Sequence, residues 1–375
     1  MKRRACSPAS SRAEGMPDRL DRQREFSGTG AVRPGQEIDV ERLEGWLAAN
    51  MAGFKGPLQV AQFRGGQSNP TYRLTAASGA YVLRRKPPGK LLPSAHAVER
   101  EYRVISALHP LSFPVARPHL LCSDESVIGT VFYVMDFVAG RVVWEPFVPD
   151  ADGPERAAVF DQLNATIARL HSIDPAAAGL TDFGRAEGYV GRQIRRWSEQ
   201  YRASATETIA EMDRLMDFLP DAAPQSTMAA IVHGDFRLDN CILDGAAPRI
   251  LAVLDWELAT LGDPIADFTY HLMQWRMPPS PTGAGVGTLI GHEDLEGLPL
   301  IEDYVAAYCT RRDLAGIPDL DLYLAYNFFR MAAIYQGIVG RVRDGTAANP
   351  NAACMAGQVR PMAEVAWSYA RRAGA

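Results

Sequence analysis

Apolar and polar positions along the chain follow two different periods, which divide it near residue 138. Residues 58–63 alternate between the two kinds, and residues 81–86 and 130–137 contain short apolar runs, as β-strands do. Beyond Gly140 the apolar residues recur every three or four positions, which is typical of helices. The pattern therefore predicts an α+β protein with a small sheet lobe over residues 39–138 and a larger, mainly helical lobe over residues 139–375.

Two segments of the first lobe have helical rather than strand spacing. Residues 38–51 are expected to form the helix that opens the folded part, and residues 95–108 have the apolar stripe of an amphipathic helix. Between the strands, residues 64–70 contain Gly65 and Gly66 and predict a hairpin turn. The small lobe is thus expected to be a five-stranded antiparallel sheet with one helix packed on it.

Residues 1–38 are rich in Arg, Ser, Gly and Pro and contain few large apolar side chains. Such a composition buries too little surface to offset the chain entropy lost on folding. We therefore expect a disordered tail here. A transit peptide would have a similar start, but the acids at positions 14, 18, 21 and 25 argue against it.

Composition narrows the class of protein. A chain of 375 residues is long enough for two lobes, and a net charge of −5 disfavours a general nucleic-acid or anionic-membrane binder. The five cysteines are scattered without a Cys-x-x-Cys pair, so neither a disulfide framework nor a zinc site is indicated. We expect a cytoplasmic protein with no membrane segment.

Residues 231–243 and 250–257 hold the most informative pattern in the chain. Two apolar runs flank a polar insert, as when a loop that carries chemistry joins two buried strands. Phosphoryl transfer requires a carboxylate to orient the acceptor hydroxyl, together with an amide oxygen and a second carboxylate for Mg²⁺. Asp235, Asn240 and Asp255 supply these groups. The alternative, that they only cap turns, does not require this order of residue types.

The residues of this region resemble a known family. The segment His233-Gly234-Asp235 with Asn240, then Asp255-Trp256-Glu257, then Gly262-Asp263-Pro264 with Asp267, is similar to the aminoglycoside phosphotransferase and choline kinase family. The resemblance implies a protein-kinase-like fold of two lobes, with ATP and Mg²⁺ as cofactors and a small-molecule hydroxyl as acceptor. It implies that Asp235 is the catalytic base and that Asn240 and Asp255 bind the metal. His233 and Asp267 are expected to hold the catalytic loop.

The same resemblance implies where the nucleotide binds. The glycine turn would cover the phosphates, Arg84 would contact them while paired with Glu101, and the backbone at residues 136–138 would bond the adenine. Arg85, Lys86 and Glu99 remain open as alternatives for the cation and its partner. The residues assigned to nucleotide binding are Gly66, Ser68, Asn69, Arg84, Glu101, Asp136 and Val138.

Residues 83–102 and 326–338 look like a subgroup of the family in which the kinase domain is fused, in eukaryotes, to an acyl-CoA dehydrogenase. This implies hydroxy acids or hydroxyacyl-CoA thioesters as acceptors. Arg330, Arg341 and Arg343 also suit an anionic acceptor better than a polycationic aminoglycoside. Alternatives are an antibiotic kinase and a nucleotide-binding scaffold with weak turnover. A protein kinase is disfavoured, because no activation-loop motif follows Asp255.

Overall fold

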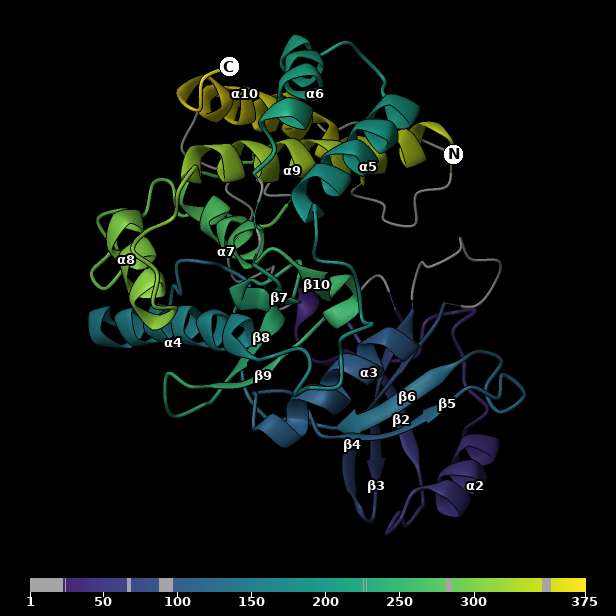
Figure 1. Cartoon of the computed structure of the whole chain (residues 1–375). Helices are drawn as coiled ribbons and strands as arrows, with labels where there is room; N and C mark the ends of the chain where they lie inside the picture. The colour runs from purple at the N-terminus through teal and green to yellow at the C-terminus, as the bar shows by residue number, and fades with distance from the viewer. Residues whose placement is uncertain are drawn as a thin grey trace, which may run out of the picture.

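The computed structural model describes residues 23, 25–65, 69–87, 97–224, 226, 228–280, 285–345 and 352–375. Figure 1 shows a sheet lobe at one end, a group of helices at the other, and short strands with α7 between them. The predicted α+β, kinase-like fold of two lobes is confirmed.

The small lobe is a six-stranded antiparallel sheet with strand order β1-β2-β3-β4-β6-β5. Its core contains Leu43, Tyr72, Leu83 and Phe132, all fully buried. Helix α2 belongs to this lobe in addition to α3, so the described part of the lobe has more than the one helix expected. The elements are β1 (Thr29–Gly30), α2 (Val40–Asn50), β2 (Gln59–Phe63), β3 (Thr71–Ala76), β4 (Gly79–Arg85), α3 (Val98–Leu108), β5 (Pro118–Cys122) and β6 (Phe132–Asp136).

The prediction of a disordered tail over residues 1–38 is wrong for residues 25–38, and the sheet has a sixth strand. Thr29 pairs with Phe63 along the edge of β2. The Tyr72 hydroxyl donates to the carbonyl of Gln36 at 2.7 Å, and the Arg33 amide donates to the side chain of Gln62 at 2.8 Å. A two-residue strand is too short to show a periodicity in the sequence. The position of this segment is fixed by these long-range hydrogen bonds.

The large lobe is built around one long helix. Helix α9 is buried on most of its surface and packs against α5, α7 and α10. The antiparallel strand pair β7–β10 and the hairpin β8–β9 lie between it and the small lobe (Figure 1). Its elements are α4 (Gly153–Ser172), α5 (Tyr189–Ser204), α6 (Ala210–Ala222), β7 (Ala230–Val232), β8 (Cys241–Leu243), β9 (Ile250–Val253), β10 (Thr260–Gly262), α7 (Pro264–Leu272), α8 (Ile301–Arg311), α9 (Leu320–Arg343) and α10 (Ala356–Arg372).

Five single turns of 3₁₀ helix complete the described secondary structure: η1 (His109–Leu111), η2 (Leu238–Asn240), η3 (Trp256–Leu258), η4 (Met273–Trp275) and η5 (Ala352–Met355). Helix α3 joins the lobes, since it packs on η3 and its Arg100 donates to the carbonyls of Phe183 at 2.7 Å and Ala259 at 3.3 Å.

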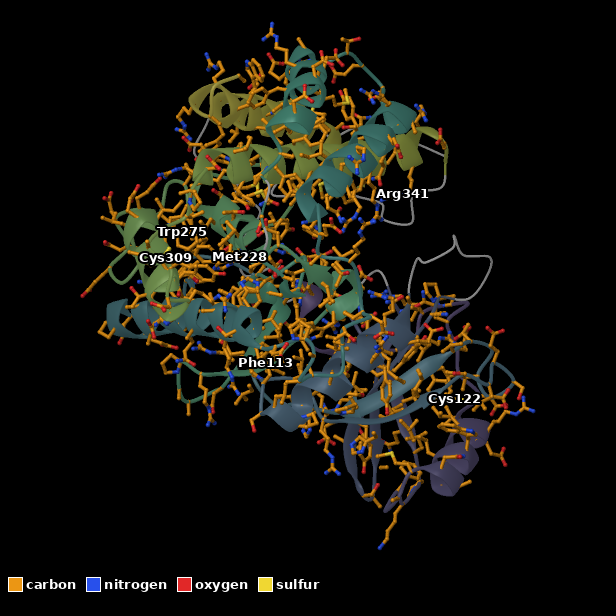
Figure 2. The ribbon with its side chains drawn as sticks, viewed as in Figure 1. Phe113, Cys122, Met228, Trp275, Cys309 and Arg341 are labelled. Carbon is orange, nitrogen blue, oxygen red and sulfur yellow. The ribbon has the colours of Figure 1, made fainter. Side chains whose placement is uncertain are left out.

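The cysteines are free thiols in the part of the chain that the structure covers. Figure 2 places Cys122 in the sheet lobe and Cys309 in the helical lobe, far from each other. No helix among the described residues is both long and apolar enough to span a bilayer.

Candidate active site

The loop that follows β7 is held by one buried carboxylate from α7. Asp267 accepts hydrogen bonds from the backbone amides of His233 at 2.7 Å and Gly234 at 2.8 Å, and its Oδ2 lies 3.1 Å from Nε2 of His171. Burial alone raises the pKa of Asp267, but the hydrogen bond from His171 and the amide donors outweigh burial and lower it. Burial lowers the pKa of His171, which therefore acts as a neutral donor. The expected anchoring role of Asp267 agrees with these contacts.

The ring of His233 connects this loop to the next hairpin. Its Nε2 lies 2.8 Å from the carbonyl oxygen of Leu254, and its Nδ1 accepts from the amide of Asp235 at 3.2 Å. These partners require a neutral ring with its proton on Nε2. His233 is fully buried and thereby ties the backbone of Asp235 to the residue that precedes Asp255.

The Asp235 carboxylate accepts from three side chains. Tyr270 donates to Oδ1 at 2.6 Å, Arg237 Nε lies 3.0 Å from the same oxygen, and Asn240 Nδ2 lies 3.1 Å from Oδ2. Asn240 also donates to the backbone carbonyl of Asp235 at 2.8 Å. The predicted base and the predicted amide ligand are therefore in direct contact.

Asp255 lies beside this pair because Asn240 and Asp255 stand at the open end of one hairpin, β8–β9. The amide of Leu254 donates to the carbonyl of Asn240 at 2.7 Å. Asp255 itself has a left-handed backbone with φ of 63°, a conformation that Asp tolerates better than most residues. The turn ends β9 and begins η3, and the Asp255 carboxylate forms an ion pair with Arg84.

The donor set of this region fits Mg²⁺. Because the Nδ2 group of Asn240 is committed to two oxygens of Asp235, the amide oxygen is the atom left for a cation. Asp255 supplies a carboxylate, and Mg²⁺ typically takes one or two carboxylates plus phosphate oxygens and water. Within the described ranges no three His, Cys, Asp or Glu side chains form a metal cluster.

Arg84 connects Asp255 to the small lobe. Its Nε lies 2.7 Å from Glu101 Oε2, so its guanidinium lies between Glu101 and Asp255. Burial lowers the pKa of Arg84, but the two carboxylates raise it by more, so it stays charged. Burial raises the pKa of Glu101, and Arg84 draws it back only in part. The expected Arg84–Glu101 pair is present.

Asn69 contacts the Glu101 carboxylate of this pair. It is fully buried, and its Nδ2 donates to Glu101 Oε1 at 2.7 Å. The Tyr133 hydroxyl donates to the other oxygen of Glu101 at 3.1 Å. Asn69 thus orients Glu101 in this structure, and the predicted positions Gly66 and Ser68 lie outside the described residues.

The neighbouring cations Arg85 and Lys86 point to opposite faces of the sheet, as strand alternation requires. Lys86 pairs with Glu99, whereas Arg85 points to the other face, where it is buried, bonds the carbonyl of Ile128 at 3.2 Å and lies over the Tyr72 ring. At the connection between lobes the Asp136 carboxylate bonds His119 at 2.6 Å, and Val138 is half-buried.

The three arginines expected to suit an anionic acceptor do not lie together. Arg343 is exposed at the end of α9 and pairs with Asp344. Arg341 is exposed one turn from that end (Figure 2). Arg330 is buried and donates to the Gly234 carbonyl at 2.8 Å, directly behind the catalytic loop.

Sequence reasoning did not find Tyr270 and Arg237, which both contact Asp235. Tyr270 follows Asp267 by three residues, so helical spacing puts both on one face of α7. This spacing is the feature of the sequence from which Tyr270 could have been identified. Arg237 pairs with both Asp235 and Asp239, which raises its pKa above the ordinary value although burial lowers it.

A two-lobe fold with a buried cation–carboxylate pair facing an Asp, an Asn and a second Asp defines a kinase-like phosphotransferase. Residues 59–319 match the family model described as the phosphotransferase enzyme family. The chain belongs to this family.

Most of this chain aligns with part of each of its curated relatives. Acyl-CoA dehydrogenase family member 10 of Mus musculus is 40% identical over 351 residues, which are 92% of this chain and 32% of that protein. Acyl-CoA dehydrogenase family member 11 of Homo sapiens is 37% identical over 347 residues, 91% of this chain and 44% of that protein. The chain thus spans less than half the length of these relatives.

Solved structures show the same fold. A candidate aminoglycoside phosphotransferase from Ralstonia eutropha is 45% identical, with a TM-score of 0.80 over 90% of this chain and 99% of that one. A choline kinase from Cryptosporidium parvum is 12% identical, with a TM-score of 0.60 over 89% of this chain and 97% of that one. The second likeness shows the fold alone.

Proposed function

We propose that this protein is an ATP- and Mg²⁺-dependent kinase that phosphorylates a hydroxyl group of a small molecule. The observation that carries the proposal is the convergence of Asp235, from the loop after β7, with Asn240 and Asp255, from the open end of the β8–β9 hairpin. Arg84 extends from the small lobe to Asp255. A scaffold without turnover has no need for an oriented carboxylate beside an amide ligand.

In the proposed reaction Asp235 holds the acceptor hydroxyl in line with the γ-phosphorus. The hydroxyl oxygen forms a bond to phosphorus, the bond from phosphorus to the bridging oxygen of ADP breaks, and the hydroxyl proton passes to Asp235. Asn240 and Asp255 would hold the metal. Bound Mg²⁺ supplies charge neutralisation for the phosphates, and Arg84 adds a cation on the small-lobe side. A solved spectinomycin phosphotransferase of the same fold was crystallised with ADP.

For the acceptor we propose a hydroxy acid or a hydroxyacyl-CoA thioester. Support comes from the relatives named as acyl-CoA dehydrogenase family members, of which this chain covers one part. The buried Arg330 next to the catalytic loop adds positive potential on that side. A cytoplasmic location is part of the proposal, since the described cysteines are free thiols, as reducing surroundings favour.

The test is a panel of hydroxylated metabolites assayed for ADP release with Mg·ATP. Hydroxy acids and hydroxyacyl-CoA thioesters form one arm, and aminoglycosides and choline form the other. We expect turnover in the first arm, abolished by chelating Mg²⁺. Turnover only with aminoglycosides would replace the proposed acceptor, and nucleotide binding without turnover on any compound would favour a scaffold.

Arg84→Lys should weaken ATP binding by roughly tenfold, because an ammonium group lacks the fork that reaches Glu101 and Asp255 together. Titration calorimetry with the Mg complex of a non-hydrolysable ATP analogue measures the change. Lys86→Met is the matched control, since Lys86 pairs with Glu99 outside this cluster. A larger loss for Lys86→Met than for Arg84→Lys would assign the phosphate contact to Lys86.

A further inference from the structure

The two oxygens of the Asp235 carboxylate have unequal surroundings. Oδ1 accepts from the Tyr270 hydroxyl at 2.6 Å and from Arg237 Nε at 3.0 Å. Among the described residues Oδ2 has one donor, Asn240 Nδ2 at 3.1 Å, and Asn240 is one of the proposed metal ligands. A carboxylate oxygen accepts about two hydrogen bonds, so Oδ1 is saturated and Oδ2 has capacity for one more.

Helix α7 contacts the catalytic loop at two points one turn apart. Asp267 accepts from the amides of His233 and Gly234, and Tyr270 donates to the Asp235 side chain. Residues three apart on a helix lie on the same face, so both contacts come from one side of α7. The helix therefore sets the position of the loop backbone and the rotation of the Asp235 side chain together.

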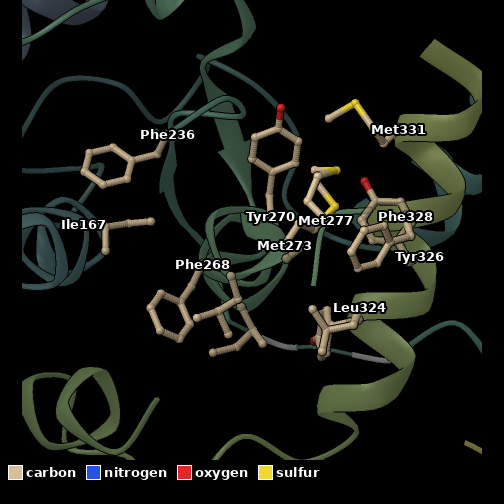
Figure 3. Close-up of a cluster of buried hydrophobic side chains, with 14 of the residues drawn as sticks. Ile167, Phe236, Phe268, Tyr270, Met273, Met277, Leu324, Tyr326, Phe328 and Met331 are labelled. Atoms are coloured by element: carbon tan, nitrogen blue, oxygen red, sulfur yellow. The ribbon is translucent and has the colours of Figure 1, made fainter. Parts of the chain in front are cut away.

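The Tyr270 ring is itself held in place. It is 5% exposed, and the guanidinium carbon of Arg330 lies 4.8 Å from the ring centroid. Figure 3 shows the ring among buried side chains of α7 and α9, with its hydroxyl directed away from Phe268 and Leu324. Arg330 in turn donates to the Gly234 carbonyl at 2.8 Å. The packed ring holds its hydroxyl at Oδ1 of Asp235.

We propose that Tyr270 is a positioning residue that occupies Oδ1 of Asp235 and thereby presents Oδ2 to the acceptor hydroxyl. This rests on the proposed kinase function. The proton released as the acceptor oxygen bonds to phosphorus then goes to Oδ2, while Tyr270 and Arg237 keep their hydrogen bonds to Oδ1. Tyr270 touches neither the acceptor nor the nucleotide and acts through Asp235.

The test compares Tyr270→Phe with Tyr304→Phe. Both changes remove one hydroxyl from a buried tyrosine, but the Tyr304 hydroxyl bonds the His271 ring at 2.9 Å and does not contact Asp235. We expect Tyr270→Phe to lower kcat roughly ten- to one-hundredfold, the range for losing a hydrogen bond to a charged group, with little change in acceptor KM or ATP affinity. Tyr304→Phe should lose comparable thermal stability and keep kcat within about twofold of the wild type.

A kcat for Tyr270→Phe equal to that of Tyr304→Phe would overturn the proposal, because both hydroxyls would then be merely structural. A crystal structure of Tyr270→Phe adds a readout independent of turnover. The Asp235 side chain should rotate or occupy two conformers, and an unchanged carboxylate orientation would count against the positioning role. Should the wild type turn over no compound of the panel, the kinase proposal fails while the crystallographic comparison still decides what Tyr270 does.

Discussion

Asp235→Asn should lower kcat for phosphoryl transfer by about a thousandfold while ATP affinity stays near that of the wild type. General base catalysis of this kind typically contributes 10²–10⁴-fold, and Asn cannot take up the acceptor proton. Its shape is conserved, and its amide oxygen can still accept from Tyr270, so the loop should keep its fold. ADP release measures turnover, and calorimetry with an ATP analogue measures binding.

The matched control for that change is Asp244→Asn, in the turn that follows β8. Asp244 is a surface acid that pairs with Arg249 away from the catalytic loop, and its replacement should leave both quantities unchanged. If turnover of Asp235→Asn stayed within tenfold of the wild type, Asp235 would not be the catalytic base. Joint loss of turnover and nucleotide binding would instead indicate that the loop has collapsed.

Asp267→Ala should reduce the free energy of unfolding by about 3–5 kcal/mol, the largest stability effect we expect from a single substitution near the site. The change leaves two backbone amides and the His171 ring without their acceptor in a fully buried place. Urea unfolding followed by tryptophan fluorescence measures it. The control is Asp182→Ala, because Asp182 forms an exposed ion pair with Arg103. This change should hardly shift the midpoint of the urea unfolding transition.

The effect of Asp267→Ala should depend on pH. Folding lowers the pKa of Asp267 below its ordinary value of 3.8, so the folded state binds this proton less readily than the unfolded state. The stabilisation is therefore fully present above about pH 5 and is lost as the pH falls through the lowered pKa. The free energies of unfolding of wild type and variant should differ most near pH 7 and converge in acid. A difference that grows on acidification would contradict the assignment.

Much of the site could be predicted because its main residues are close in the sequence. His233, Asp235 and Asn240 lie within one loop, and the hairpin that follows brings Asp255 beside them through local backbone bonds. Strand alternation alone leaves Arg84 and Lys86 on one face, and only the family resemblance favours Arg84 with Glu101, the pair that the structure contains. The ordered segment at residues 25–38 could not be predicted, since its bonds reach Gln62 and Tyr72 across the sheet.

The sequence by itself determined the order and spacing of the chemical groups, on which the family resemblance rests, and its apolar periodicity separated a sheet lobe from a helical lobe. The orientation of Asp235 was decided by packing. Its Tyr270 contact joins residues 35 apart, and the Arg330 contact with Gly234 joins residues 96 apart. Contacts of that separation depend on how α7 and α9 dock against the loop, and no local pattern records that docking.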